Sequence, residues 1–287
     1  MIEGLYDYII SSYVGNEQIK SIQSVAGGCI NNTSRIATNK GVYFVKVNSS
    51  ANTYLFEKEE KGLNLLKQVS PLKTPSVLGR GEFHNNTYLL LEWVDKGIAS
   101  VNFWKKFGQL LAEQHKITKS EFGLDHDNHI GRLNQSNQRH IDWYDFFIKE
   151  RLLPQINLAN DNHLLDANTL NQFDSFFQRL KDLIPLENPA LLHGDLWSGN
   201  FLCGHPEEPY LVDPAIHFGH RETEIAFTTM FGGFKQEFYD SYNDIFPLEP
   251  GFESRIEIHN LYPLLVHLNL FGTSYLGGIK STLKKFS

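Results

Sequence analysis

The chain has 287 residues, of which 41% are hydrophobic and 21% are charged, and its formal net charge is −7. These values are typical of a globular protein with enough chain to bury a sizeable core. The negative balance and the lack of a Lys/Arg block disfavour a nucleic-acid surface, which needs a basic face, so we expect no nucleic-acid partner.

The sequence also argues against export and against a membrane. Its first residues include Glu3 and Asp7 in place of the basic segment of a signal peptide. No apolar run reaches the roughly 18 residues that a membrane span needs. The two cysteines, Cys29 and Cys203, are too few for a disulfide framework. We therefore expect a protein of the reducing cytoplasm, and the sequence leaves its oligomeric state open.

The first third of the chain predicts a small antiparallel sheet with one helix inserted after the third strand. Apolar residues at helical spacing open the chain, and Gly15 ends that segment. Alternating segments separated by turn residues then favour strands, while Pro71 and Pro75 stop the inserted helix. The expected elements are a helix at 2–14, strands at 21–25, 32–38 and 42–47, a helix at 53–69, and strands at 76–80 and 87–93 with Asn85 and Asn86 as the turn.

Beyond Trp93 the chain becomes mainly helical, after a short connector at 94–99. We expect two domains, at 1–94 and 95–287, and an α+β fold class. No internal repeat or low-complexity segment is present in the sequence. The helices expected in the second domain lie near 100–117, 141–158, 167–184, 222–231, 235–245 and 253–271.

Residues 191–213 carry the strongest chemical signal in the sequence. His193-Gly-Asp195 followed by Asn200 has the H-x-D-x-x-x-x-N spacing of kinase catalytic loops. In such a loop Asp195 accepts the proton of an attacking hydroxyl, while Asn200 and Asp213 hold Mg²⁺ against the phosphates of ATP. This assignment requires a strand-turn-strand that returns Asp213 to the loop. His193 is expected to pack and to form hydrogen bonds, with Asp195 as the base.

Lys46 is the predicted phosphate contact of the first domain. It alternates with apolar residues on a strand that we expect to be buried, and a buried lysine needs a partner of opposite charge. An ATP phosphate and a carboxylate from the following helix would satisfy it; an edge-strand lysine that reaches solvent is the alternative. Glu59 is favoured over Glu57 and Glu60, because neighbouring apolar residues mark the inward face of that helix.

Two further segments are candidates for ATP binding. Gly27 and Gly28 form a candidate loop over the phosphates, since glycines let backbone N–H groups approach an anion. An ordinary Gly-Gly hairpin is the alternative. Glu92, Trp93 and Val94 end the last strand of the first domain and are the candidate hinge, whose backbone groups would bind the adenine edge. The alternative is a buried strand that simply ends there.

Other reactive or metal-binding side chains give weaker signals. Cys29 follows the two glycines and is a candidate redox-sensitive thiol, because unpaired backbone N–H groups favour the thiolate; an unreactive cysteine is the alternative. Trp197, between the base and the metal ligand, is either a wall of the acceptor site or a core tryptophan. Closely spaced histidines such as His126 and His129 lack the spacing of a zinc site.

With these residues assembled, the sequence resembles the fructosamine kinase (ketosamine-3-kinase) family, which is related to aminoglycoside phosphotransferases, choline kinases and, more distantly, protein kinases. The resemblance runs almost end to end. HGDLxxxN is shared with the aminoglycoside and choline kinases, whereas Trp-Ser-Gly in the loop, DNHIG and the DPA-to-GHRE segment are more particular to fructosamine kinases. The matching segments are AGGCIN, FVKV, FEKEEKGL, FGLDHDNHIGRLNQSN, DWYDFFIKERLLPQ, HGDLWSGN, DPAIHFGHRETEIAFTTMFGGF and LVHLNLFG.

The resemblance implies a bilobal protein-kinase-like fold. Its small amino-terminal lobe would have a five-stranded antiparallel sheet and one key helix, and its larger carboxy-terminal lobe would be mainly helical. It also implies ATP- and Mg²⁺-dependent phosphorylation of the 3-hydroxyl of a ketosamine, either a small molecule or protein-bound. The 3-phosphate is unstable and eliminates to return the free amine, so the implied role is deglycation repair.

Matched residue by residue, the resemblance makes Asp195 the base, Asn200 and Asp213 the metal ligands, and Lys46 the phosphate contact with Glu59 as its partner. The acceptor side is more loosely defined, with His217 where family members often have an aromatic residue. Residues implied near the acceptor are Trp197, His220, Arg221 and Glu222.

The identity of the sugar and of the amine stays open at this point. A phosphotransferase for another small hydroxylated amine, such as an aminoglycoside or choline, is the first alternative. A catalytically silent nucleotide-binding protein is the second, and the presence of the full set of Lys46, Asp195, Asn200 and Asp213 argues against it.

Overall fold

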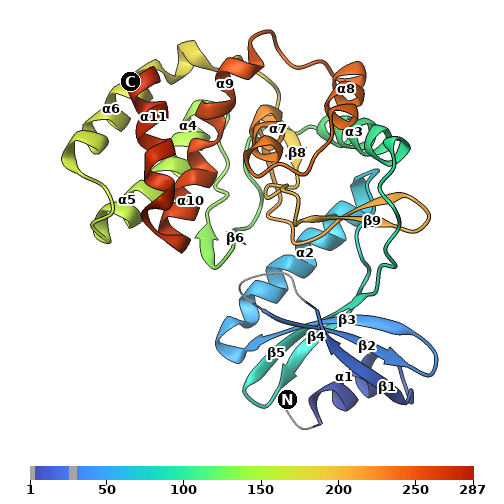
Figure 1. Ribbon diagram of the computed structural model, residues 1–287. Coiled ribbons are helices and arrows are strands. Elements are labelled where there is room, and N and C mark those ends of the chain that lie inside the picture. The colour runs from blue at the N-terminus through green and yellow to red at the C-terminus, as the bar shows by residue number, and fades with distance from the viewer. Residues whose placement is uncertain (1–3, 26–30) are drawn as a thin grey trace. The chain divides into compact units, whose positions relative to one another are not determined.

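The computed structural model describes residues 4–25 and 31–287 and divides into two compact units (Figure 1). Unit 1 comprises the chain up to Phe103 together with Gly199–Pro214, and unit 2 comprises Trp104–Ser198 and Ala215–Ser287. The predicted division between residues 94 and 95 therefore falls inside unit 1. The second segment of unit 1, Gly199–Pro214, includes the end of the predicted kinase-like loop, with Asn200 and Asp213.

Unit 1 is built on a five-stranded antiparallel sheet with the strand order β1-β2-β3-β5-β4, and one helix packs on each face. The predicted sheet with a helix inserted after its third strand is confirmed. The elements are α1 (Leu5–Tyr13), β1 (Ile19–Ser24), β2 (Asn32–Thr38), β3 (Val42–Ser49), a 3₁₀ turn (Ser50–Asn52), α2 (Thr53–Val69), β4 (Val77–Phe83) and β5 (Asn86–Glu92).

Alternation along the central strands decides which side chains meet which helix, since successive residues of a strand face opposite sides of the sheet. On β3, Val45 and Val47 join the α1 cluster, and on β5, Tyr88 and Leu90 do the same. Residues of the other parity, such as Leu89, pack against α2 with Phe56 and Leu63 of that helix. Lys46 has the parity of this second set and so faces α2.

The second segment of unit 1 is a hairpin of β9 (Phe201–Gly204) and β10 (Glu208–Leu211). The predicted strand-turn-strand is confirmed. The hairpin is held to the rest of unit 1 by backbone hydrogen bonds, from Gly97 N–H to the Cys203 carbonyl at 2.8 Å and from Leu211 N–H to the Lys73 carbonyl at 2.8 Å.

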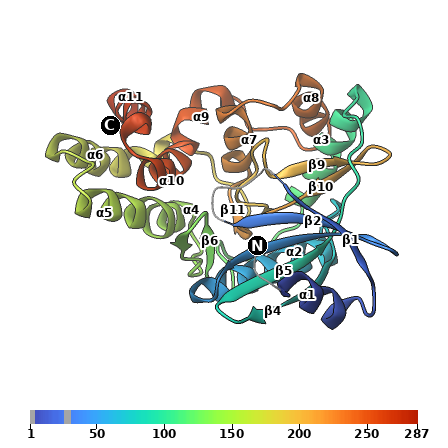
Figure 2. The same cartoon turned by 60° about the horizontal axis from the view of Figure 1, so that its bottom comes forward.

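Unit 2 is mainly helical, with two short strand pairs, β6–β7 and β8–β11 (Figures 1 and 2). Its largest core cluster joins aromatic residues such as Phe146 and Phe173 to aliphatic residues of the last helices, such as Leu265 and Leu283. Within the described residues, no helix is both long and apolar enough to cross a membrane. The elements are α3 (Val101–His115, beginning in unit 1), β6 (Asn128–Ile130), β7 (Leu133–Gln135), α4 (Trp143–Phe146), the π-helix η2 (Phe147–Leu152), α5 (Leu153–Asp161), α6 (Ala167–Leu183), β8 (Ala190–Leu192), β11 (His217–Gly219), α7 (Arg221–Met230), α8 (Gln236–Ile245), α9 (Phe252–His259), α10 (Leu261–Phe271), a 3₁₀ turn (Thr273–Tyr275) and α11 (Leu276–Phe286).

Three details of the predicted elements are wrong. The turn before β5 is formed by His84 and Asn85, with His84 in the left-handed region at φ 52°, and Asn86 already belongs to the strand. The helix expected at 253–271 is two helices that meet at Asn260, because Pro263 cannot donate the backbone hydrogen bond of a continuous helix. Helix α11 was not predicted, because two adjacent glycines, 277 and 278, lower its helix propensity.

Candidate active site

Lys46 is a buried cation of unit 1 with two carboxylate partners. Its side chain is 5% exposed, and its Nζ donates to Glu59 Oε1 at 2.7 Å and also to Asp213 Oδ1. Of the three glutamates considered from the sequence, Glu59 is therefore the helix partner, while Glu57 pairs with Lys61 and Glu60 pairs with Arg80. The edge-strand alternative does not hold, because β3 lies between β2 and β5.

Burial and neighbouring charges shift the pKa values of Lys46 and Glu59. Burial alone would lower the pKa of Lys46, but Asp213 and Glu59 together outweigh burial and raise the pKa above its usual value. Burial raises the pKa of Glu59 to about 7, with the charge of Asp213 adding to the effect and Lys46 opposing it. Lys46 therefore stays charged and fixed in place, which suits a group that binds phosphate oxygens.

The β9–β10 hairpin brings Asn200 and Asp213 to the same end of unit 1. Phe201 pairs with Leu211 at the open end of the hairpin, and the Val212 N–H donates to the Asn200 carbonyl at 3.0 Å. Asn200 thus precedes the first strand directly, and Asp213 follows the second after one residue. Asp213 has φ 55°, a left-handed conformation that costs energy for a residue other than glycine and that is often found at functional sites.

The donor set at this end fits Mg²⁺. Asn200 offers an amide oxygen and Asp213 a carboxylate whose side chain is 44% exposed, and Mg²⁺ prefers a small number of such oxygen ligands together with water and substrate phosphates. Lys46 already contacts Asp213, so a nucleotide phosphate bound through the metal would lie within the reach of the same lysine.

In unit 2 the loop that carries Asp195 is fixed by close backbone contacts. His193 is fully buried, its carbonyl accepts from the Ala215 N–H at 2.9 Å, and its Nδ1 accepts from the Asp195 N–H at 3.3 Å. Gly194 has φ 83°, and a Cβ there would lie 2.1 Å from the Ala215 backbone oxygen. Only glycine therefore fits where these two backbone segments approach each other. His193 therefore supports the loop, as the sequence predicts.

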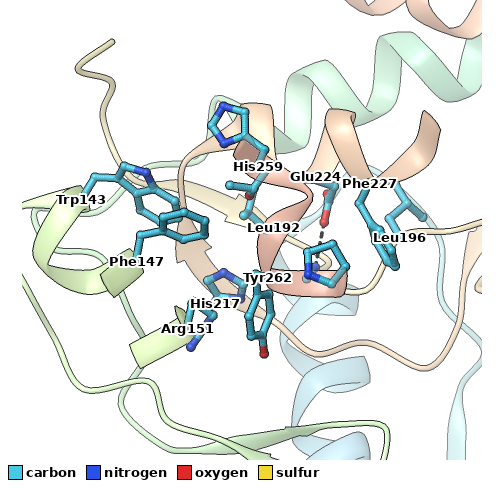
Figure 3. Close-up of a pocket in the computed structure, with 13 residues that line it drawn as sticks. Trp143, Phe147, Arg151, Leu192, Leu196, His217, Glu224, Phe227, His259 and Tyr262 are labelled. Carbon is cyan, nitrogen blue, oxygen red and sulfur yellow. Dashed lines mark hydrogen bonds between the residues drawn. The ribbon is translucent and has the colours of Figure 1, made fainter. Parts of the chain in front are cut away.

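Glu224 of α7 is a residue of this site that sequence analysis did not find. Its Oε1 accepts from the Gly194 N–H at 2.7 Å (Figure 3). Its Oε2 accepts from the His193 N–H at 3.2 Å and from His115 Nε2 at 2.9 Å. Burial alone would raise the pKa of Glu224, but His115, His193 and the Gly194 N–H lower it. An ionised, buried carboxylate therefore holds the two peptide groups that precede Asp195.

Trp197 is a partly exposed residue of the same loop, with 38% of its surface accessible, and is not a core tryptophan. Its ring lies edge-on to Phe231 with ring centroids 6.1 Å apart, and Phe231 in turn lies 5.0 Å from His267. Burial lowers the pKa of His267, whose Nδ1 donates to the Pro263 carbonyl. These three rings form an aromatic row that begins two residues after Asp195.

His220, Arg221 and Glu222 lie inside unit 2, where protein groups take up their polar atoms. Arg221 donates to Glu187 at 2.7 Å, and Glu222 accepts from Arg255 through both carboxylate oxygens and from His259 Nε2 at 3.0 Å. Their predicted contact with the acceptor finds no support in this arrangement. A metal ion is disfavoured at Glu222 with His220 and His259, since the Arg255 guanidinium already occupies the carboxylate.

The remaining ATP-binding candidates belong to unit 1. Glu92 ends β5, where its N–H donates to the Ser76 carbonyl at 2.9 Å, and the Trp93 ring stacks beneath the Arg35 guanidinium at 5.2 Å. Val94 is buried, and its side chain lies next to Gly204 of the β9–β10 hairpin. Their predicted contact with adenine stays a prediction. Gly27, Gly28 and Cys29 lie outside the described residues.

Comparison with known proteins identifies the family to which the chain belongs. The model of the fructosamine kinase family matches residues 5–287. The chain belongs to the fructosamine kinase family. A probable ketoamine kinase of Enterococcus faecium is 39% identical over 264 residues, covering 91% of this chain and 94% of that protein. A chloroplastic protein-ribulosamine 3-kinase of Arabidopsis thaliana is 35% identical over 274 residues, covering 94% and 83%.

Structural comparison agrees with the family assignment. A crystal structure of a proposed fructosamine-3-kinase of Haemophilus somnus superposes with a TM-score of 0.88 at 27% sequence identity, covering 98% of this chain and 96% of that one. The expected protein-kinase-like α+β fold, with a five-stranded antiparallel sheet and a mainly helical second part, is confirmed. As a fructosamine kinase family member with this fold, the protein is an ATP-dependent kinase.

Proposed function

We propose that this fructosamine kinase family member transfers the γ-phosphate of ATP to the 3-hydroxyl of a ketosamine, and that elimination of the resulting phosphate returns the free amine. Family membership supports the acceptor class. The single structural observation that carries the proposal is the fixed loop around Asp195, held by Glu224 through two peptide N–H groups. This loop carries Asp195 in the sequence context of a kinase base.

The chain's own residues account for binding and orientation in this reaction. Lys46, held by Glu59, contacts the phosphates of ATP, and Asn200 and Asp213 are the ligands for Mg²⁺. The metal, when bound, neutralises charge on the phosphates during transfer. Asp195 accepts a hydrogen bond from the attacking hydroxyl and receives its proton, which places the oxygen for in-line attack without a covalent enzyme intermediate.

The acceptor is bound by residues of unit 2. The row of Trp197, Phe231 and His267 offers a partly exposed aromatic surface next to Asp195 in the chain, suited to the apolar faces of a sugar-derived amine. An exposed surface can also receive the larger amine of a protein-bound adduct. For this acceptor we keep Trp197 and set His220, Arg221 and Glu222 aside, because their polar atoms bind protein groups.

The hinge assignment of Glu92, Trp93 and Val94, the phosphate loop of Gly27 and Gly28, and a cytoplasmic location remain part of the proposal as predictions. A redox-sensitive Cys29 has the same standing. Each is separable from the phosphoryl-transfer step, which depends on the residues described above.

An ATP-turnover panel tests the proposed function. The substrates are erythrulosyl-, ribulosyl- and fructosyl-lysine, with kanamycin and choline as the competing acceptors. We expect Mg²⁺-dependent ADP release with one or more ketosamines, and a phosphorus NMR signal of a secondary-alcohol phosphate that decays as free lysine appears. Turnover of kanamycin or choline with no ketosamine turned over would falsify the proposal.

A further inference from the structure

A cavity lies inside unit 2 directly behind the Asp195 loop (Figure 3). Gly194 and Leu196, the two neighbours of Asp195, both line it, and Tyr262 closes it from α10. Burial raises the pKa of Tyr262; the charge of Arg151 opposes this, and that of Asp195 adds to it, which places the tyrosine within electrostatic range of the base. The cavity is therefore next to the predicted reacting group and belongs to one unit.

The π-helix η2 shapes one wall of this cavity. Trp143, Phe147 and Arg151 recur at intervals of four along the continuous helical stretch from α4 through η2, and all three line the cavity. A π-helical turn contains more than four residues, so residues at this spacing stay on one face, and such turns are frequent at functional sites. Figure 3 shows the stacked rings of Trp143 and Phe147 on one side and Arg151 beside His217.

Three buried polar atoms on the cavity-lining residues have no hydrogen-bond partner within the described part of the chain. They are Trp143 Nε1, Arg151 Nε and His259 Nδ1, on residues only 2%, 1% and 1% exposed. Indole and guanidinium N–H groups only donate. His259 Nε2 lies 3.0 Å from a Glu222 carboxylate oxygen, which can only accept, so the imidazole proton is on Nε2 and Nδ1 is an acceptor.

Two unpaired buried donors and one unpaired buried acceptor each carry a desolvation penalty until a partner arrives. A hydroxyl group both donates and accepts, so hydroxyl groups suit these three atoms. Aromatic walls together with a few polar groups are the usual lining of small-molecule pockets. The lining also carries one cation, Arg151, and one carboxylate, Glu224, so its formal charges balance and the surroundings favour a neutral, hydroxylated carbon chain.

The size of the cavity sets the length of that chain. Centres of water molecules can occupy about 40 Å³ of it. Since one water needs roughly 10–15 Å³ on this measure, the cavity holds about three groups of water size. A ketosamine has one, two or three carbons beyond its reacting hydroxyl when it derives from a four-, five- or six-carbon sugar. Each of these carbons carries an oxygen, so the longest tail has the most atoms and fills the cavity most completely.

We propose that this cavity is the sugar-tail pocket of the enzyme: it receives the hydroxylated carbons beyond the 3-hydroxyl, with their hydroxyl groups at Trp143 and His259, while the amine points outward along Trp197. The proposal rests on the proposed function for its acceptor. It assigns sugar selection to buried residues of α4, η2 and α9, and amine selection to the exposed aromatic row. The two halves of the substrate are then recognised independently.

The test compares two tryptophan-to-phenylalanine variants. Trp143→Phe removes the pocket N–H and keeps an aromatic ring, while Trp104→Phe makes the same change at a buried residue of α3 outside the pocket. We expect Trp143→Phe to lower kcat/KM about tenfold for fructosyl-lysine and less than twofold for erythrulosyl-lysine. The KM for ATP should not change, and Trp104→Phe should leave the ratio between the two sugars as in the parent protein.

The unaltered protein gives an independent measurement that does not depend on the folding of a variant. Fructosyl-lysine is compared with an analogue in which the tail hydroxyls beyond carbon 4 are replaced by hydrogen, and we expect a lower kcat/KM for the analogue. Equal kcat/KM values for the two substrates would overturn the pocket assignment. So would an equal loss for long and short sugars in Trp143→Phe. Absence of turnover with every ketosamine in the parent protein is a different result, because it removes the proposed function itself.

Discussion

At the scale of single residues, the site depends on charges that are fixed before any substrate binds. Lys46 is fixed by Glu59 in unit 1, and the Asp195 loop is fixed by Glu224 in unit 2. Both glutamates act through another group and touch no reacting atom in the proposed mechanism. Their contribution is preorganisation, which lowers the cost of reaching the transition-state geometry.

Replacing the base separates chemistry from nucleotide binding. Asp195→Asn keeps the size of the side chain and removes its ability to take a proton, so kcat should fall by about a thousandfold with little change in the KM for ATP. Steady-state kinetics with the ketosamine found in the substrate panel measures both values. Asp174→Asn, an exposed substitution on α6, is the control and should behave as the parent protein. Substantial turnover in Asp195→Asn would remove the base assignment.

Glu224 provides a sharper test of positioning. In Glu224→Gln only one oxygen remains to accept from the His193 and Gly194 N–H groups, and the new NH₂ faces a donor. We expect kcat to fall roughly 10- to 100-fold, because the loop shifts relative to the substrate, while the KM for ATP stays constant. Glu113→Gln, an exposed change on α3, is the matched control. A loss of ATP affinity with unchanged kcat would contradict the positioning role.

At the scale of elements, local patterns predict those parts of the fold whose ends are marked in the chain. Helix α2 begins and ends where predicted, at Thr53 and Val69, because Pro71 prevents its extension. Helix α11 was missed, since its stability comes from residues such as Ile279 and Leu283 packing in the core of unit 2, which outweighs its two glycines.

The same limit applies to the candidate site. The spacing from Asp195 to Asn200 and Asp213 lies in one short stretch, and so it could be recognised from the sequence. The role of Glu224 depends on α7 lying against β8, and the tail pocket depends on four segments distant in the chain that pack around one space. No local pattern carries that information, because it arises only when the segments pack together.

One helix contact gives an element-scale prediction. At Gly108 of α3 a Cβ would lie 2.1 Å from the Phe238 backbone oxygen of α8, so Gly108→Ala forces the two helices apart. We expect a loss of about 3 kcal/mol in the free energy of unfolding. Gly277→Ala on α11 is the control: nothing lies within 4 Å of its Cβ position, and helix propensity should make it stabilising by up to about 1 kcal/mol. Chemical denaturation measures the free energy of unfolding of both variants. Equal stabilities of the two would refute the close contact at Gly108.

At the scale of the whole molecule, buried histidines link the stability of unit 2 to pH. Burial lowers the pKa of His220 to about 3, with the neighbouring charge of His259 acting in the same direction. Burial also lowers the pKa of His217 and His259. Burial alone would raise the pKa of Glu222, but Arg255 and His259 bring it to about 2. All four groups therefore favour unfolding in acid, in two different pH ranges.

Between pH 7 and pH 5, Glu222 does not contribute, whereas Glu59 of unit 1 titrates with the opposite effect on stability, so the histidine effect is obtained from the difference between the parent protein and a histidine variant. An unfolded histidine binds a proton near pH 6.5, whereas folded His220 stays neutral, so the unfolded state binds more protons and stability falls as the pH falls. The neutral form is also required structurally, because His220 Nδ1 caps α7 by accepting from the Glu222 N–H while its Nε2 donates to the Pro185 carbonyl. For this one group the loss between pH 7 and pH 5 is about 2 kcal/mol.

His220→Asn tests this linkage, because asparagine is a good helix N-cap and does not titrate. The variant should lose about 2 kcal/mol less than the parent protein when the pH is lowered from 7 to 5, although the remaining histidines keep some slope. Urea denaturation at the two pH values measures the difference directly. Parallel losses in the two proteins would mean that His220 titrates alike in the folded and unfolded chains, and the acid sensitivity of unit 2 would then have to come from His217, His259 and His267.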